Sequence, residues 1–290
     1  MTRGCGVLWR EYKFWQVNDR LWTDADTESY ASGGCDGVKY RARRPVARKA
    51  SLDFLRSLRG LRAADIEGRF PDDTPAFDVA TLETLMLHTK CAAPLDLTHL
   101  HALIELGVDH RPNLEAIRGW AALTGLEVWD WEGDDLRFLG SKPALKSLRL
   151  EGIKSSAGSL TGIEDCPALE ELTVLDTRLV GLEPLRALSA LRRVHITQSA
   201  PSDGVPWDLS ALARSGDLTW LTLTFCGPVA SVRPLLEMRA LRDVRLRGTT
   251  IVDGDIQPLI DLPTEVVVGP FDDHPHYSHT CAEVRHLRRR

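Results

Sequence analysis

The chain has 290 residues, of which 43% are hydrophobic and 27% are charged. This composition is typical of a folded protein and excludes a largely disordered chain. The formal net charge of −5 argues against general nucleic-acid affinity, because such affinity needs a basic surface that displaces phosphate counterions. No apolar run reaches the roughly 18 to 20 residues that span a bilayer, and we expect neither a membrane span nor a secretory signal.

Residues 1–50 differ from the remainder of the chain. They lack the repeat described below and contain three tryptophans, Trp9, Trp15 and Trp22. The run from 7 to 17 is rich in aromatic and β-branched residues, which favour strands. We therefore predict that residues 1–50 form an N-terminal cap with strand character, which covers the first apolar turn of the array that follows.

Residues 51–268 contain an internal repeat with the pattern LxxLxxLxL. Three copies align on a shared Glu-Gly: LRGLRAADIEG (58–68), LTGLEVWDWEG (123–133) and PALKSLRLEG (143–152). The last apolar positions of the successive copies are Ile66, Leu87, Val108, Trp131, Leu150, Val174, Ile196, Leu223, Leu246 and Val268. Gaps of 19 to 27 residues between these positions indicate about ten copies of one structural unit.

The physical chemistry of one copy predicts its structure. The xLxLx stretch alternates apolar and polar residues, so it is a short strand with one buried face. The preceding LxxL has a spacing of three, which fits a helical or 3₁₀ turn. No copy can bury its apolar side alone, but stacked copies pair their strands in parallel and share a core. We predict a right-handed α/β solenoid with strands on the concave face and short turns on the convex face.

Three stretches resemble a known family: VLDTRLVGLEPL (174–185), VRPL (232–235) and VRLRGTTIVDGDIQPL (244–259). They are similar to the short 22-residue class of leucine-rich repeats, found in internalins and phosphatase-regulatory repeat proteins, which reads LxxLxLxxNxIxDIxPLxxL. The resemblance covers about residues 52 to 268. It implies an Asn that ties neighbouring turns together; this chain has instead Ile153, Thr177, Ser199, Cys226 and Thr249. Small hydroxyls can still bond to the backbone.

The residues that flank each apolar pair are predicted to point outward from the concave sheet. The early copies place acidic residues there and the later copies place Arg and His around one Trp. The predicted binding residues are Asp109, Asp130, Glu132, Arg149, Glu151, Arg193, His195, Trp220, Thr222, Arg245 and Arg247. Such charge segregation orients a charged partner, and a Trp flanked by Arg has the composition of a binding hot spot. The alternative is that these are solvated strand positions.

Two further sets of aromatic residues are assigned to the body of the protein. Trp129 and Trp131 share the register of Leu148 and Leu150, so both are predicted to lie in the core. The longest gap contains a Pro- and Gly-rich loop at 198–208, in which we expect Trp207 to anchor the loop to the body.

Residues 269–290 are predicted to form a C-terminal cap and tail. The run from 272 to 281 contains three His, one Cys and two Asp, which are metal-ligand types. Its HxHxxH spacing matches no closed zinc pattern, so we expect a solvated cap without metal. Residues 286–290 are predicted to be disordered.

The six cysteines are Cys5, Cys35, Cys91, Cys166, Cys226 and Cys281. They lie far apart in the sequence and include no CxxC pair. In a chain of this length such cysteines indicate reduced thiols of a cytoplasmic protein, not a disulfide framework.

The sequence contains no P-loop, GxSxG, HExxH or strand-linked GxGxxG motif. His195 could form an acid–base pair with Glu171 or Asp243 across strands about 4.8 Å apart. We predict a non-catalytic module that binds a partner protein on the concave face, without a cofactor. One alternative is an immunity or regulatory inhibitor of one specific partner, which an acidic face would suit if that partner is basic. The other is a metal-dependent or acid–base enzyme.

Overall fold

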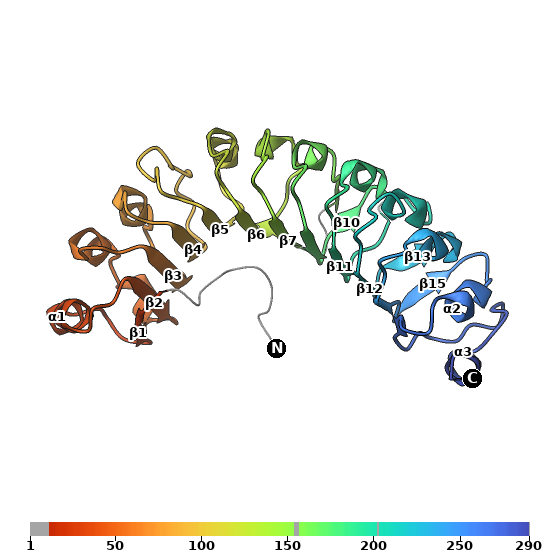
Figure 1. The fold of residues 1–290 in the computed structure, drawn as a ribbon. Coiled ribbons are helices and arrows are strands. Elements are labelled where there is room, and N and C mark those ends of the chain that lie inside the picture. The colour runs from red at the N-terminus through yellow and green to blue at the C-terminus, as the bar shows by residue number, and fades with distance from the viewer. Residues whose placement is uncertain (1–11, 154–156, 202, 290) are drawn as a thin grey trace. The chain divides into compact units, whose positions relative to one another are not determined.

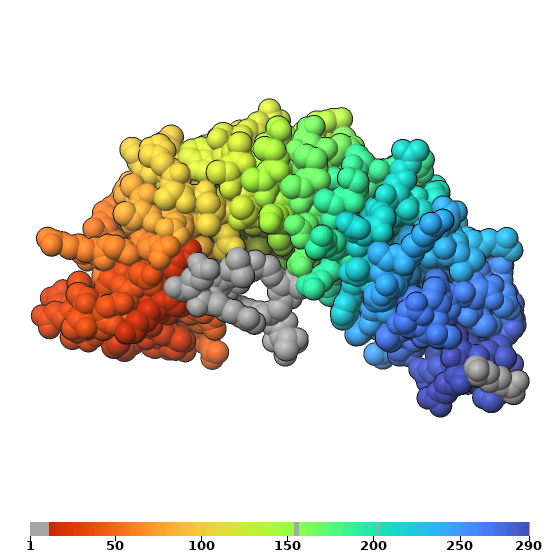
Figure 2. Space-filling model, in the orientation of Figure 1, coloured from red at the N-terminus to blue at the C-terminus, as the bar shows by residue number. Residues whose placement is uncertain are grey.

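A computed structural model of the protein describes residues 12–153, 157–201 and 203–289. The chain divides into two units, Met1–Asp130 and Trp131–Arg290, called unit 1 and unit 2 below. In each unit parallel strands lie along one side and short helical turns along the other, and side chains fill the space between successive coils (Figures 1 and 2). Among the described residues, no helix is long and apolar enough to span a bilayer.

Unit 1 contains strands that pair in parallel and in chain order (Figure 1). They are β1 (Phe14–Asn18), β2 (Gly37–Ala42), β3 (Ala63–Gly68), β4 (Thr84–His88), β5 (Glu105–Asp109) and β6 (Gly125–Trp131), the last ending one residue into unit 2. The turns between them are α1 (Asp24–Ser32) and the 3₁₀ helices η2 (Val46–Arg48), η3 (Asp53–Ser57), η4 (Thr74–Asp78) and η5 (Leu114–Gly119).

Unit 2 continues the same construction with a second, shorter layer of strands. Its main parallel strands are β7 (Ser147–Gly152), β9 (Glu171–Leu175), β11 (Arg193–Thr197), β12 (Trp220–Thr224), β14 (Asp243–Arg245) and β16 (Val267–Val268). The short pairs are β8 (Ala157–Gly158) with β10 (Arg178–Leu179) and β13 (Gly227–Val229) with β15 (Thr249–Ile251). The helical turns are η6 (Arg137–Leu139), η7 (Ile163–Asp165), η8 (Glu183–Ala187), η9 (Leu209–Leu212), η10 (Arg233–Glu237), α2 (Gln257–Asp261) and α3 (Cys281–Leu287).

The predicted fold class is confirmed by these parallel strands and 3₁₀ turns. In β7 the pair Leu148 and Leu150 is buried, and it lies beside the buried pair Leu172 and Val174 of β9. Alternation along the strand sends the intervening residues to the opposite face. Trp207 is buried and pairs with Val229, so it anchors its loop as predicted.

Small polar side chains take over the role of the family's Asn in unit 2. The Oγ1 of Thr249 donates to the carbonyl of Leu223 in the preceding coil, at 3.0 Å. The Sγ of Cys226 lies 3.0 Å from the carbonyl of Ile196 in the same way. The expectation that a small hydroxyl bonds to the backbone is therefore confirmed at Thr249, and the thiol of Cys226 is placed in the same way.

The predicted register of the fourth copy was wrong. In β6, Leu126 lies beside Leu106 and Val128 beside Val108, so Leu126 and Val128 are the buried pair. Trp129 is consequently half-buried on the outward face and does not belong to the core. Trp131 is buried, but at the position of the family's Asn. The alternation Trp-Asp-Trp resembles the apolar pair of a strand, and this caused the wrong assignment. With Val128 as the last apolar position of the copy, the gaps to Val108 and Leu150 are 20 and 22 residues, which are more even than the gaps from Trp131.

The ends of the chain also contain more regular structure than expected. β1 and β2 pair in parallel with the repeat strands, so the sheet extends into the segment assigned to a cap, and the described residues contain two coils more than the predicted ten. The division of domains at residues 50 and 268 stays a prediction. Residues 286–287 belong to α3, so their predicted disorder was wrong. Trp9 and Cys5 lie outside the described residues.

Candidate functional site

Three neighbouring strands of unit 2 bring the later predicted residues together. Arg193 of β11 lies beside Trp220 of β12, which lies beside Asp243 of β14. One step further along the strands, His195 lies beside Thr222, which lies beside Arg245. Because residues two apart share a face of a strand, all six project from the same side of the sheet.

Trp220 is held in place although it is 39% exposed. Its indole Nε1 donates to the Oγ1 of Thr222 at 2.7 Å. The guanidinium of Arg245 lies over the ring, 4.8 Å from the centroid, which is a cation–π arrangement. The Nε and Nη2 of Arg245 donate to the two carboxylate oxygens of Asp243 at 2.9 and 3.1 Å. This bidentate pair fixes the plane of the guanidinium above Trp220.

The acid–base pair considered for His195 is not formed. Glu171 accepts from the guanidinium of Arg193 at 2.9 Å, and Asp243 is engaged by Arg245. The Nε2 of His195 lies 2.7 Å from the Oγ1 of Thr197. His195 is exposed, but desolvation by its neighbours lowers its pKa, and the positive charges of Arg149 and Arg245 lower it further. A lowered pKa favours the neutral imidazole, which acts as a hydrogen-bonding group.

A second exposed aromatic residue was missed by the sequence analysis. Phe225 follows β12 and is 52% exposed. The guanidinium of Arg247 lies 5.8 Å from its ring centroid. A Cβ at Gly248 would lie 2.2 Å from the ring of Phe225, so the ring rests against bare backbone. The signal was present, because the matching position of other copies is polar, as in Asp176 and Gln198.

These side chains form one feature, the arginine–aromatic patch, which consists of Arg193, Trp220, Phe225, Arg245 and Arg247. Val267 of β16 lies beside Asp243 and is also exposed, so apolar surface continues beyond the patch. Thr222 is buried beneath it. Farther along unit 2, Arg149 of β7 donates to Glu151 at 3.0 Å, so these two predicted binding residues satisfy each other.

The acidic residues of unit 1 are neutralised to an extent that the sequence analysis did not foresee. Asp65 and Glu67 lie 3.7 and 3.3 Å from Arg41 of β2, a residue that had been assigned to the cap. Asp109 is buried, accepts from the backbone N–H of Lys90 at 2.6 Å and lies 3.5 Å from its Nζ. Asp130 also pairs with Lys90.

The corrected register also moves two predicted site residues. Asp130 has a φ of 51° and follows the part of β6 that pairs with β5. Glu132 lies beyond the strand. Neither occupies the outward strand position predicted for it, because that prediction rested on the false Trp129–Trp131 pair. Glu127 occupies the central outward position in their place, beside Gly107 of β5.

The His-rich run contributes packing contacts at the C-terminal end of unit 2. The phenolic oxygen of Tyr277 accepts from the backbone N–H of Ile251 at 2.7 Å, and the Nε2 of His276 lies 3.0 Å from the Ile251 carbonyl. In the part of the chain that the structure describes, no group of three or more His, Cys, Asp or Glu is placed to hold a metal ion.

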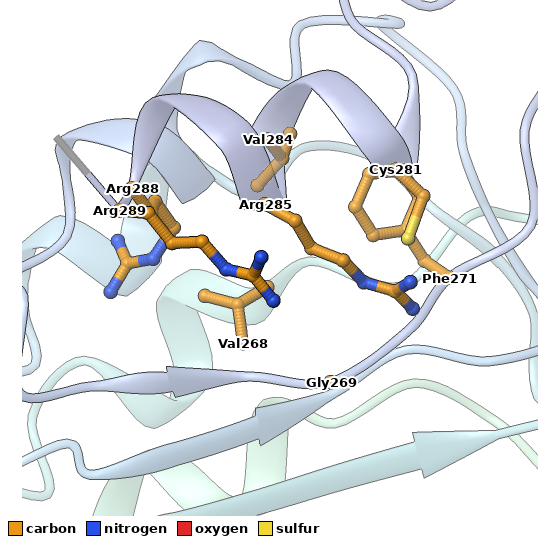
Figure 3. A pocket seen from close by; sticks show the side chains of 8 residues that line it. All are labelled: Val268, Gly269, Phe271, Cys281, Val284, Arg285, Arg288 and Arg289. Carbon is orange, nitrogen blue, oxygen red and sulfur yellow. The ribbon is translucent and has the colours of Figure 1, made fainter.

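A small pocket of about 140 Å³ lies between α3 and the end of the sheet (Figure 3). Arg288 lines it and donates to the carbonyls of Leu259 and Leu262, both at 2.8 Å, and of Val266 at 2.6 Å. These bonds satisfy the carbonyls at the end of α2 and fix α3 on the sheet. The volume is below the roughly 300 to 1,000 Å³ of typical ligand pockets, so this pocket belongs to the C-terminal cap.

Comparison with solved structures identifies the architecture. The internalin InlF from Listeria monocytogenes superposes with a TM-score of 0.58, over 82% of this chain and 77% of that chain. The chain has the leucine-rich-repeat fold. The functional domain of InlJ from the same organism matches with a TM-score of 0.54, over 87% of this chain and 57% of that one. The plant peptide hormone receptor RGFR1 matches at 0.56, over 89% and 45%.

Sequence identities to these three leucine-rich-repeat structures are 14%, 13% and 11% respectively. At this level the likeness shows the fold alone. No protein-family model matches the sequence, and no curated protein matches it. The resemblance to internalins inferred from the repeat pattern is thus confirmed as a likeness of fold, and the role of the site rests on this chain's own residues.

Proposed function

We propose that this leucine-rich-repeat chain is a non-catalytic interaction module, which binds a partner protein through the arginine–aromatic patch of unit 2. One observation carries the proposal: Trp220 stands exposed on the sheet face and is clamped between Arg245 and Thr222. Trp and Arg are the residue types most enriched among binding hot spots. Exposed aromatic surface next to polar groups is typical of interaction sites.

The fixed positions of the side chains in the patch also favour binding. A side chain that is already fixed loses little conformational entropy when a partner covers it. Trp220 is fixed by a hydrogen bond and a cation–π contact, and Arg245 is fixed by Asp243. The patch therefore presents a rigid amphipathic anchor.

Charge defines the partner more closely. Arg193 and Arg245 are neutralised by Glu171 and Asp243, whereas Arg247 has no carboxylate partner among the described residues. We propose that the partner places an acidic group near Arg247 and an apolar group against Trp220. An acidic face would have suited the inhibitor alternative if the partner is basic, and the paired carboxylates of unit 1 do not support such a face.

One structure with a similar fold supports a protein or peptide as the partner. The RGFR1 structure is that of a peptide hormone receptor in complex with RGF2. A peptide hormone receptor can therefore be built on a fold like that of this chain. Proteins that share this fold need not share a ligand, because repeat surfaces are scaffolds for unrelated partners.

We predict that Trp220→Ala lowers partner affinity by at least about 2 kcal/mol, or roughly 30-fold, and leaves the fold intact. The loss follows from removal of the anchor, and the fold survives because the ring projects outward. The partner is first isolated by affinity purification from the native cell and identified by mass spectrometry. Surface plasmon resonance then compares the purified variants.

Leu236→Ala is the matched control, because Leu236 is an exposed apolar residue of η10 outside the patch. It should bind like the wild type. If Trp220→Ala also binds like the wild type, or if both variants lose affinity equally, the partner does not use the patch.

We also propose that the protein is located in the reducing cytoplasm. The oxidation state of its cysteines tests this proposal. Cys35, Cys91, Cys166, Cys226 and Cys281 are free. Burial raises the pKa of Cys166 to about 11 and that of Cys226 to about 12. Both thiols should therefore resist alkylation of the native protein at pH 8, because the reactive thiolate is scarce.

Mass spectrometry of the protein from its native cell, alkylated after unfolding without reductant, should find all six cysteines modified. A native disulfide at any of them would contradict the proposed location. Rapid labelling of Cys226 in the native protein would contradict its buried environment.

A further inference from the structure

A row of cations follows the strands of unit 1. Counting on from the paired residues, the same position after β1 to β5 is filled by Arg20, Arg43, Arg69, Lys90 and Arg111. This is the position of the family's Asn, which in later coils of unit 2 holds small residues such as Thr177 and Ser199. Successive coils lie about 4.8 Å apart, so the cations repel one another unless something neutralises them.

The protein neutralises the two ends of this row and leaves its middle open. Arg20 donates to Asp26 at 2.6 Å, and Arg111 donates to Asp73 at 2.9 and 3.1 Å. Lys90 pairs with Asp109 and Asp130, as described above.

Arg43 and Arg69 lie in the open middle of the row. Arg43 is 91% exposed and reaches a carboxylate only at 3.8 Å, that of Asp19. Arg69 is exposed and has no acidic partner among the described residues. These two guanidiniums keep hydrogen-bond donors available to a ligand.

The open middle of the row borders a cavity of about 570 Å³. Five cationic side chains line it, namely Arg41, Arg43, Arg44, Arg69 and Lys90, together with the carboxylates of Asp19 and Glu67. Neither carboxylate pairs with Arg69, because Glu67 lies 3.3 Å from Arg41 and Asp19 lies 3.8 Å from Arg43. The cavity therefore carries an excess of positive charge on a fixed backbone.

We propose that this basic pocket binds a phosphoryl group, carried either by a small phosphate ester or by a phosphorylated side chain of a protein. The planar guanidinium group can donate two hydrogen bonds to the oxygens of a phosphate. A phosphoryl dianion can also form ion pairs with more than one unpaired cation at a time. The cavity exceeds the size of a phosphate group alone, so it leaves room for the body of the ligand.

The pocket and the arginine–aromatic patch share no residue. Unit 1 supplies every residue of the pocket, and unit 2 supplies every residue of the patch. Loss of phosphoryl binding would therefore leave the proposed protein-binding function standing, and the converse also holds.

Isothermal titration calorimetry of the full chain at about 50 mM salt, where charge screening is weak, tests the proposal. The probes are phenyl phosphate, a phosphoserine peptide, and glutarate as a dicarboxylate of similar charge. At least one phosphate probe should bind at least about tenfold tighter than glutarate. The tighter of the two phosphate probes identifies the source of the group. Equal binding of glutarate, or no binding of either phosphate probe, overturns the proposal.

Paired double variants locate the site. The double variant Arg43→Gln with Arg69→Gln should weaken phosphate binding at least about tenfold, because it removes the charge-assisted hydrogen bonds of both guanidiniums. Arg48→Gln with Arg59→Gln removes the same charge from exposed positions outside the pocket and should change affinity little. Equal losses in both double variants would show diffuse attraction and overturn the assignment.

A third variant keeps the result interpretable if the first double variant fails to fold. Arg43→Lys with Arg69→Lys retains both charges and removes both guanidinium forks. It should bind the phosphate probe more weakly than the wild type, because an ammonium group is a point charge and cannot donate in the bidentate geometry of a guanidinium. Unchanged phosphate affinity in this variant would contradict recognition by Arg43 and Arg69.

Discussion

Asp73→Ala should lower the free energy of unfolding of unit 1 by about 3 to 5 kcal/mol. Asp73 is fully buried and accepts two hydrogen bonds from Arg111 and one from the hydroxyl of Thr89. Arg111 is itself buried. Removing the carboxylate leaves a guanidinium without its counter-charge in a region that water does not reach, and that cost is much larger than the value of an exposed ion pair.

Urea titration followed by circular dichroism measures this effect. Asp53→Ala is the matched control, since Asp53 pairs with Arg56 at the surface, and it should cost less than about 1 kcal/mol. The double variant Asp73→Leu with Arg111→Met should recover most of the loss, because it removes both charges together. A loss below about 1 kcal/mol for Asp73→Ala would show that the pair is not isolated from solvent.

Leu148→Ala should destabilise unit 2 by about 2 to 5 kcal/mol. Leu148 is 1% exposed and lies beside Leu172 in the core of the sheet. The truncation removes buried apolar surface and leaves a cavity, which the rigid backbone of neighbouring coils cannot fully close.

The same urea titration serves here, with Leu236→Ala as the exposed control, which should stay within about 0.5 kcal/mol of the wild type. A change below about 1 kcal/mol for Leu148→Ala would mean that the strand register of the repeat is wrong.

The leucine positions of the repeat could be predicted because their periods are local. Leu148 and Leu150 are two residues apart on a strand, and period two alone places both on one face. The coils of β1 and β2 escaped the same analysis because they fill these positions with other residues. The two leucine positions are occupied by Trp15 and Val17 in β1 and by Val38 and Tyr40 in β2. A core accepts any apolar side chains of suitable volume, so a search for leucine finds only part of the array.

The C-terminal helix was missed for a related reason. Thr280 and Glu283 form a capping box at the start of α3, a pattern that is visible in the sequence. The helix has only seven residues, and a helix this short is marginal in isolation. Arg288 and the core contact of Val284 stabilise it on the end of the sheet.

The sequence by itself determined the repeat, the parallel strands and, outside β6, which side chains point outward, because each depends on spacings of two to about 22 residues along one chain. Only the tertiary structure decided what those side chains meet. Arg41 neutralises Glu67, and Lys90 neutralises Asp109, across neighbouring coils. Such pairing depends on the lateral register of coils some 20 residues apart. An error of an odd number of residues reverses the faces of a strand, as the three-residue error did for β6. The charge of a surface is set by these pairings, and the order of acids and bases in the sequence does not contain them.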